Sequence, residues 1–76
     1  MSTWKPINDY PGDQLYDDIP STPTASFWGE IGREQNGVWS WTIMATDDQA
    51  QQWEAAGGVA DTEDAAKRTV ETWRAE

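Results

Sequence analysis

Six tryptophans in a chain of 76 residues set the strongest constraint on what this sequence can fold into. They are Trp4, Trp28, Trp39, Trp41, Trp53 and Trp73. Each indole brings a large apolar area and one N–H donor that needs a partner. The chain has no cysteine and no histidine, so disulfides and the commonest zinc sites cannot brace a domain this small. We therefore predict that most of the five tryptophans after Trp4 lie in the core. Trp28 is the expected exception, either covered by the N-terminal residues or offered to a partner.

The chain is strongly acidic. Fourteen Asp and Glu residues oppose five Lys and Arg residues, a formal net charge of −9. This balance argues against direct binding of nucleic acid or of an anionic membrane. It favours a basic partner, or serves solubility alone. No apolar run approaches the roughly 20 residues of a membrane span, and no apolar stretch near the N-terminus suggests a signal peptide. The expected location is the cytoplasm, of the host cell if the protein is phage-encoded.

The first 25 residues are expected to form an arm that precedes the folded domain. All four prolines of the chain lie in this stretch, and its aspartates are Asp9, Asp13, Asp17 and Asp18. Proline interrupts regular structure, but the apolar residues between the prolines are too many for a purely solvated tail. Either the arm packs over the domain in an extended form, or it orders on a partner. Residues 13–18 could also form one helical turn.

An antiparallel hairpin is predicted over residues 26–45. Asn36-Gly37 separates two runs rich in aromatic and β-branched residues, which is a strong hairpin signal. Alternation in the second run places Trp39, Trp41 and Ile43 on one face. In the first run, Phe27 and Ile31 share one face, and Trp28 and Glu30 share the other. Gly29 and Gly32 indicate either a bulge or a place where a tryptophan ring lies over the backbone.

Residues 46–60 allow two interpretations. The segment from Thr46 to Gln49 resembles a helix capping box, and good helix formers follow it. The alternative is a turn at 47–49 and a third strand at about 52–60. We favour the strand, because a two-stranded hairpin is marginal without a third strand or a helix. A hairpin followed by two helices remains the alternative.

A C-terminal helix is predicted over residues 62–75. Asp61 or Thr62 can serve as the N-cap. The acidic residues Glu63 and Asp64 in the first turn interact favourably with the helix dipole. Ala66, Val70 and Trp73 lie at helical spacing and form one apolar stripe. This stripe is expected to pack on the sheet.

Three pieces of the sequence resemble a recurring pattern in small bacterial and phage proteins to which no agreed activity is attached. The pieces are Trp39-Ser40-Trp41, then Gly57-Gly58-Val59-Ala60, then the acidic and alanine-rich segment 61–66. The resemblance implies an α+β fold, a small three-stranded antiparallel meander crossed by one helix. The expected organisation is an arm over residues 1–25 and a β-β-β-α domain over residues 26–76.

No segment carries a catalytic, cofactor or metal signature. The carboxylate pairs Asp17/Asp18 and Asp47/Asp48 fall in expected loops, where water keeps them from the desolvation that acid–base catalysis needs. The spacing of an EF-hand calcium loop is missing from 13–18. We therefore expect that the protein is not an enzyme and takes no cofactor.

Charge, size and the absence of catalytic residues predict a non-enzymatic acidic interaction protein, encoded by a phage, that binds and modulates a basic host protein. A sharper form of this hypothesis is mimicry of nucleic acid. The candidate partner-binding residues are Asp9, Asp13, Asp17, Asp18, Trp28, Asp47 and Asp48. The alternative is a small structural or accessory subunit of a virion or a self-assembling oligomer. A homodimer formed by edge-to-edge strand pairing is also plausible on these grounds.

Overall fold

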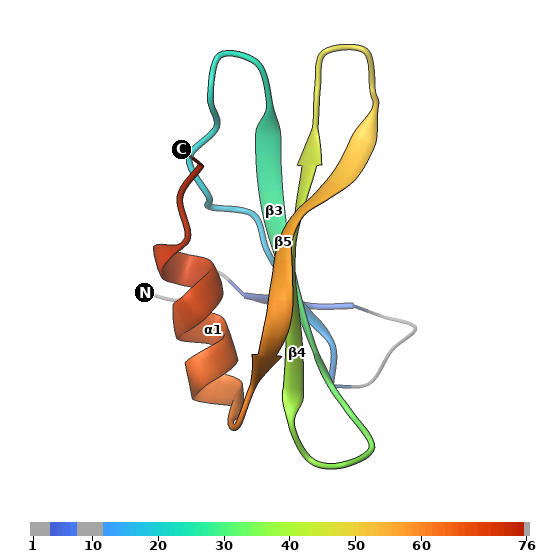
Figure 1. The fold of residues 1–76 in the computed structure, drawn as a ribbon, viewed down its shortest axis with the longest axis vertical. Helices are drawn as coiled ribbons and strands as arrows, with labels where there is room; N and C mark the ends of the chain where they lie inside the picture. Colours follow the sequence, from blue (N-terminus) through green and yellow to red (C-terminus); the bar gives the residue numbers. More distant parts are fainter. Residues whose placement is uncertain (1–3, 8–11, 76) are drawn as a thin grey trace.

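The computed structural model describes residues 4–7 and 12–75, which form one antiparallel sheet and one helix (Figure 1). The elements are β1 (Lys5–Pro6), β2 (Gln14–Tyr16), β3 (Ser26–Arg33), β4 (Trp39–Thr46), β5 (Gln52–Ala60) and α1 (Glu63–Thr72). The strands lie in the order β1-β2-β3-β4-β5, and all neighbours are antiparallel. Each strand therefore pairs only with its neighbours along the chain.

The sheet has five strands, so the predicted three-stranded sheet is wrong, although the α+β class holds. The extra strands come from the N-terminal stretch, where Pro6 pairs with Gln14 and Lys5 with Leu15. Proline is tolerated there because β1 is an edge strand. Strands of two and three residues are too short to show a period-two pattern. The suggested helical turn over residues 13–18 is also wrong, because β2 occupies it.

The hairpin, the third strand near residue 52 and the C-terminal helix are all present. The alternative of a hairpin with two helices is therefore wrong. In Figure 1, the dark-blue segment that contains β1 runs across the direction of β3, β4 and β5, as expected where sheet twist accumulates toward an edge.

The turn between β3 and β4 differs from the expected two-residue type. Gly37 N–H donates to the Glu34 carbonyl at 3.1 Å, and Glu34 N–H donates to the Val38 carbonyl at 2.8 Å. Gly37 has φ of 87°, and Asn36 does not adopt a positive φ. This is the longer hairpin loop, in which a turn is followed by one left-handed glycine.

A β-bulge at Ala55 divides β5. Ile43 pairs with Ala56 and Met44 pairs with Glu54, so Ala55 has no partner residue on β4. An extra residue reverses the alternation of side chains along a strand. Trp53 and Ala56 therefore point to the same face, and Glu54 points to the other.

The core is aliphatic, and the prediction of a tryptophan core is wrong. The buried apolar residues are Ile19, Ile31, Ile43, Ala45, Ala66 and Val70. None of the six tryptophans is fully buried, and Trp53 keeps 43% of its surface exposed. Four of them instead pack around the rim of the core: Trp4, Trp39, Trp41 and Trp73. The ten residues of α1 cover only part of the sheet, so branched aliphatic side chains fill the covered centre and the larger indoles lie at its margin.

Helix α1 lies against the sheet by an unusually close contact. Thr62 is the N-cap, and its side-chain oxygen accepts a hydrogen bond from Ala65 N–H at 3.1 Å. A Cβ atom placed on Gly29 would collide with Cγ1 of Val70. Gly29 therefore makes room for the helix. A tryptophan ring does lie over a glycine, but it is Trp41 over Gly58, whose added Cβ would be 3.1 Å from the indole.

Replacing Gly29 by alanine should destabilise the protein by about 1–3 kcal/mol, the usual cost of overpacking a core. Denaturant unfolding of the Gly29→Ala variant measures this loss. Gly57→Ala is the control, because its added Cβ would meet its nearest atoms at 3.4 Å, an ordinary contact. The control should unfold within about 0.5 kcal/mol of wild type.

The Val70→Ala change should cost less stability in the Gly29→Ala background than in wild type, because it removes the colliding methyl group. Additive losses in the double variant would contradict the proposed contact.

Candidate functional site

The two faces of the sheet differ sharply. Helix α1 covers one face, which carries Ile31 and Ile43. The opposite face, here called the open face, carries the side chains of Leu15, Trp28, Glu30, Met44 and Glu54. Among the described residues, α1 is the single helix, and no strand packs over the open face. The open face is therefore the broadest surface on which another molecule could lie.

An apolar group occupies the middle of the open face. Trp28 stands directly opposite Met44 across the β3–β4 pair. Leu15 pairs with Glu30 and so lies diagonal to Trp28. All three apolar side chains are half-buried. The Trp28 Nε1–H donates to Oε2 of Glu30 at 2.9 Å, which satisfies the indole donor and holds the ring along the sheet.

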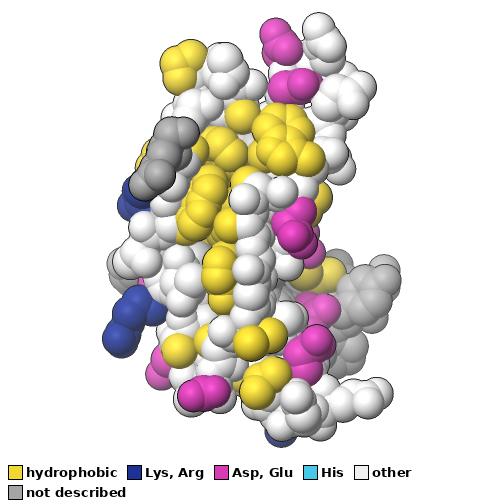
Figure 2. All heavy atoms as spheres, in the orientation of Figure 1, with side chains coloured by type: hydrophobic (Ala, Val, Ile, Leu, Met, Phe, Trp, Pro, Cys, Tyr) yellow, Lys and Arg dark blue, Asp and Glu magenta, His cyan; other side chains and the backbone are white. Residues whose placement is uncertain are grey.

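Carboxylates surround this apolar group. Glu54 pairs with Met44 on one side. Asp13 lies on the other side, with its carboxylate against Gly32. Asp17 forms an ion pair with Lys5 at 3.0 Å, and both side chains are largely exposed, so the pair adds little stability. Figure 2 shows Asp and Glu side chains along the side of the sheet away from α1.

A second group of contacts ties the N-terminal strands to α1. Trp4 Nε1–H donates to Oε2 of Glu71 at 2.7 Å, and the Trp4 ring lies 5.1 Å from the Tyr16 ring. Lys67 Nζ lies 5.7 Å from the Trp4 ring centre. Burial, followed by the nearby Asp18 and Glu71 carboxylates, raises the pKa of Tyr16 above its ordinary value. This cluster closes one edge of the core.

Glu63, at the start of α1, is held from two directions. It forms an ion pair with Lys67 at 2.9 Å and accepts a hydrogen bond from Gln14 Nε2 at 3.0 Å. The contact with Lys67, and then the one with Gln14, lower the pKa of Glu63 below its ordinary value. These bonds join β2 to the helix.

The structure brings together some of the predicted site residues and separates others. Asp13, Asp17 and Trp28 lie on or beside the open face. Asp18 follows Asp17 and is exposed. Asp47 and Asp48 lie in the turn between β4 and β5, at one end of the sheet. Asp9 lies outside the described residues.

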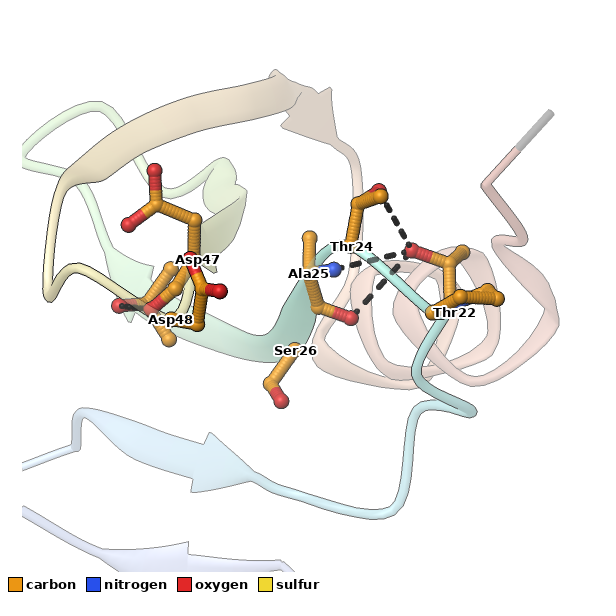
Figure 3. Close-up of a pocket in the computed structure, with 8 residues that line it drawn as sticks. Thr22, Thr24, Ala25, Ser26, Asp47 and Asp48 are labelled. Carbon is orange, nitrogen blue, oxygen red and sulfur yellow. Dashed lines mark hydrogen bonds between the residues drawn. The ribbon is translucent and has the colours of Figure 1, made fainter.

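Asp47 and Asp48 line a hollow of about 160 Å³ with residues 22–26 and Thr46 (Figure 3). Oδ1 of Asp47 accepts hydrogen bonds from the backbone N–H groups of Gln49 and Gln51, both at 2.9 Å, so it shapes the turn. The Thr22 hydroxyl is turned toward Thr24 and Ala25 rather than toward the two aspartates. The hollow is smaller than the roughly 300 Å³ at which ligand pockets begin and has no convergent set of groups.

Sequence reasoning missed three members of the open face: Leu15, Met44 and Glu54. Alternation along the predicted hairpin did place Trp28 with Glu30, and the same period extended to the second strand would have added Met44. Glu54 could not be found in this way, because the bulge at Ala55 reverses the faces of β5.

Within residues 4–7 and 12–75, no group of three or more acidic side chains is arranged to hold a metal ion. The helix in this part of the chain is not long and apolar enough to cross a membrane. Comparisons of the chain with protein families, with curated proteins and with solved structures gave no match.

Acid should weaken the bond between Glu63 and its partners. Because the pKa of Glu63 is lower in the folded state than its ordinary 4.5, the stabilisation is complete above that value and is lost as pH falls through the folded-state pKa. Glu63→Gln should be less stable than wild type at neutral pH. Its free energy of unfolding should also fall less between about pH 5 and pH 3.

Chemical denaturation at a series of pH values measures both effects. Asp64→Asn, in the same helical turn and exposed, controls for the loss of one acidic charge. Identical pH profiles for wild type and Glu63→Gln would contradict the assignment.

Proposed function

We propose that this protein is a non-enzymatic interaction module that binds a basic protein through its open face. Its action would be to occupy and modulate that protein, which in a phage-encoded chain is a protein of the host. The observation that carries the proposal is the position of Trp28, half-buried on a sheet face that no other described element covers, with the carboxylates of Glu30, Glu54 and Asp13 on the same face.

The apolar group supports a role in binding. Tryptophan is enriched among the residues that contribute most to protein interfaces, and such residues gather near the interface centre with polar groups around them. Trp28, Met44 and Leu15 have this arrangement. The hydrogen bond from Trp28 to Glu30 fixes the ring before binding, which reduces the entropy lost on association.

The charge of the face supports a basic partner. Asp13, Glu30 and Glu54 contribute carboxylates to it, in a chain of net charge −9. Such a field speeds encounter with a positively charged surface and disfavours anionic ones. Where the bound surface is itself a nucleic-acid site, the carboxylates would take the place of phosphates, and binding would compete with nucleic acid.

Affinity capture from a lysate of the host cell, washed at increasing salt and read by mass spectrometry, tests the proposal. We expect a basic protein to be retained by wild type and released as salt rises, because the attraction between exposed charges is screened. Adding duplex DNA to the wash tests for mimicry. If this chain occupies a nucleic-acid site, DNA should release the captured partner from it; if the chain binds elsewhere on the partner, DNA should have no effect.

Two variants then locate the surface on the captured partner. Trp28→Ala should weaken binding by at least about tenfold, in line with the roughly 2 kcal/mol or more that central aromatic residues contribute. The double change Glu30→Gln and Glu54→Gln should slow association and reduce its salt dependence.

The matched control is Glu34→Gln, which removes the same type of charge at the exposed tip of the β3–β4 hairpin. It should bind like wild type. Equal retention of the partner by Trp28→Ala and wild type would show that the open face is not the binding surface.

A further inference from the structure

Among the residues that the structure describes, β5 forms a free edge of the sheet. It is the last strand in the order β1-β2-β3-β4-β5 and is nine residues long. The outward N–H and C=O groups of an edge strand have no strand to pair with and can accept a further strand. In Figure 1, β5 lies in front of β4, and no other segment passes in front of it. The opposite edge, β1, has only two residues, so β5 offers the longer edge.

The segment after the bulge, residues 56–60, lacks the usual protections of an edge. Its sequence is Ala-Gly-Gly-Val-Ala, with no proline and no charged side chain. Proteins commonly guard their edges with lysine, with proline or with a bulge, and here the bulge at Ala55 lies before the segment. Val59 keeps 67% of its surface exposed. Small side chains leave the backbone open to close approach.

We propose that residues 56–60 pair with the same segment of a second copy of this chain, forming an antiparallel homodimer with a continuous sheet. A two-fold axis at Gly58 would place Ala56 opposite the partner's Ala60, and Gly57 opposite the partner's Val59. Each pair lies on one face, because Gly57 and Val59 share the open face, and Ala56 and Ala60 share the helix-covered face. The exposed Val59 would then lie beside the partner's Gly57.

Electrostatic repulsion between two copies is lower when they meet along residues 56–60 than when their open faces meet. Two chains of net charge −9 repel each other, and stacking their open faces would bring Asp13, Glu30 and Glu54 of both copies together. Pairing along residues 56–60 brings together the neutral side chains of these residues, and the one carboxylate beside them in each copy is that of Glu54, which lies against Gly57. A neutral stretch of edge in so acidic a chain therefore suits a second copy better than it suits the basic partner proposed for the open face.

Sedimentation equilibrium of the full chain, from about 1 μM to about 1 mM, tests the proposal. Five paired residues bury less area than a standard interface, so a dimer that dissociates on dilution is expected. Val59→Glu should raise the dimer dissociation constant at least tenfold, because it adds a carboxylate at the pairing segment of each copy. Gln52→Glu is the control: it adds the same charge on the same strand and face, outside residues 56–60, and should dimerise like wild type.

Amide hydrogen exchange supplies a second measurement. Part of the amides in residues 56–60 should exchange more slowly as protein concentration rises, and those of Val59→Glu should not. A monomer over the whole concentration range would overturn the proposal. So would equal weakening by both glutamate variants, or protection of these amides only in the presence of another protein. Retention of the host partner by Val59→Glu in the capture experiment would show that the open face acts independently of the dimer.

Discussion

The contact between Val70 and Gly29 determines how the rest of the molecule is arranged. It lets α1 approach the backbone of β3 closely enough to enclose Ile43 between helix and sheet. A helix of ten residues spans about 15 Å, whereas a strand of eight residues spans about 27 Å. The helix therefore covers only part of one face. The aromatic rings that remain around it, such as Phe27 against Trp73 at 5.2 Å, extend the cover beyond its end.

The two sides of the sheet differ in their balance of charge. Lys67, Arg68 and Arg74 lie in α1 or just after it and match in number the acidic Glu63, Asp64 and Glu71 of the helix. Lys67 is engaged there by Glu63. On the opposite face the carboxylates of Asp13, Glu30 and Glu54 surround Trp28, and Lys5 lies near the margin, paired with Asp17. The two sides of the sheet therefore differ in the charged side chains that they present.

The sequence was sufficient where a local signal was strong. Asn36-Gly37 located the hairpin, and Thr62 located the start of the helix, because turn and cap preferences act over three or four residues. The third strand followed from the need of a hairpin for a neighbour. The N-terminal strands carried no such signal, since β1 and β2 are shorter than one full alternation pattern and are held by pairing to β3.

The candidate site was only partly predictable from the sequence, because one of its residues depends on a local irregularity that has no sequence signal. Trp28 and Glu30 fell on one face by simple alternation, but the face of Glu54 depends on one unpaired residue, Ala55. Nothing in the composition of residues 52–60 marks a bulge there. The burial of the tryptophans was misjudged because composition reports how much apolar area a chain carries, and not how much of the sheet the helix covers.

The order of the strands has a consequence for how the chain reaches this structure. Because every strand pairs with its neighbour in sequence, the sheet can be assembled strand by strand, each strand pairing with the one made before it. The bond between Trp4 and Glu71 is different, since it joins residues 67 positions apart. During synthesis from the N-terminus, Trp4 is made well before Glu71. The Trp4 indole therefore gains its hydrogen-bond acceptor only once α1 has been made and has docked on the sheet.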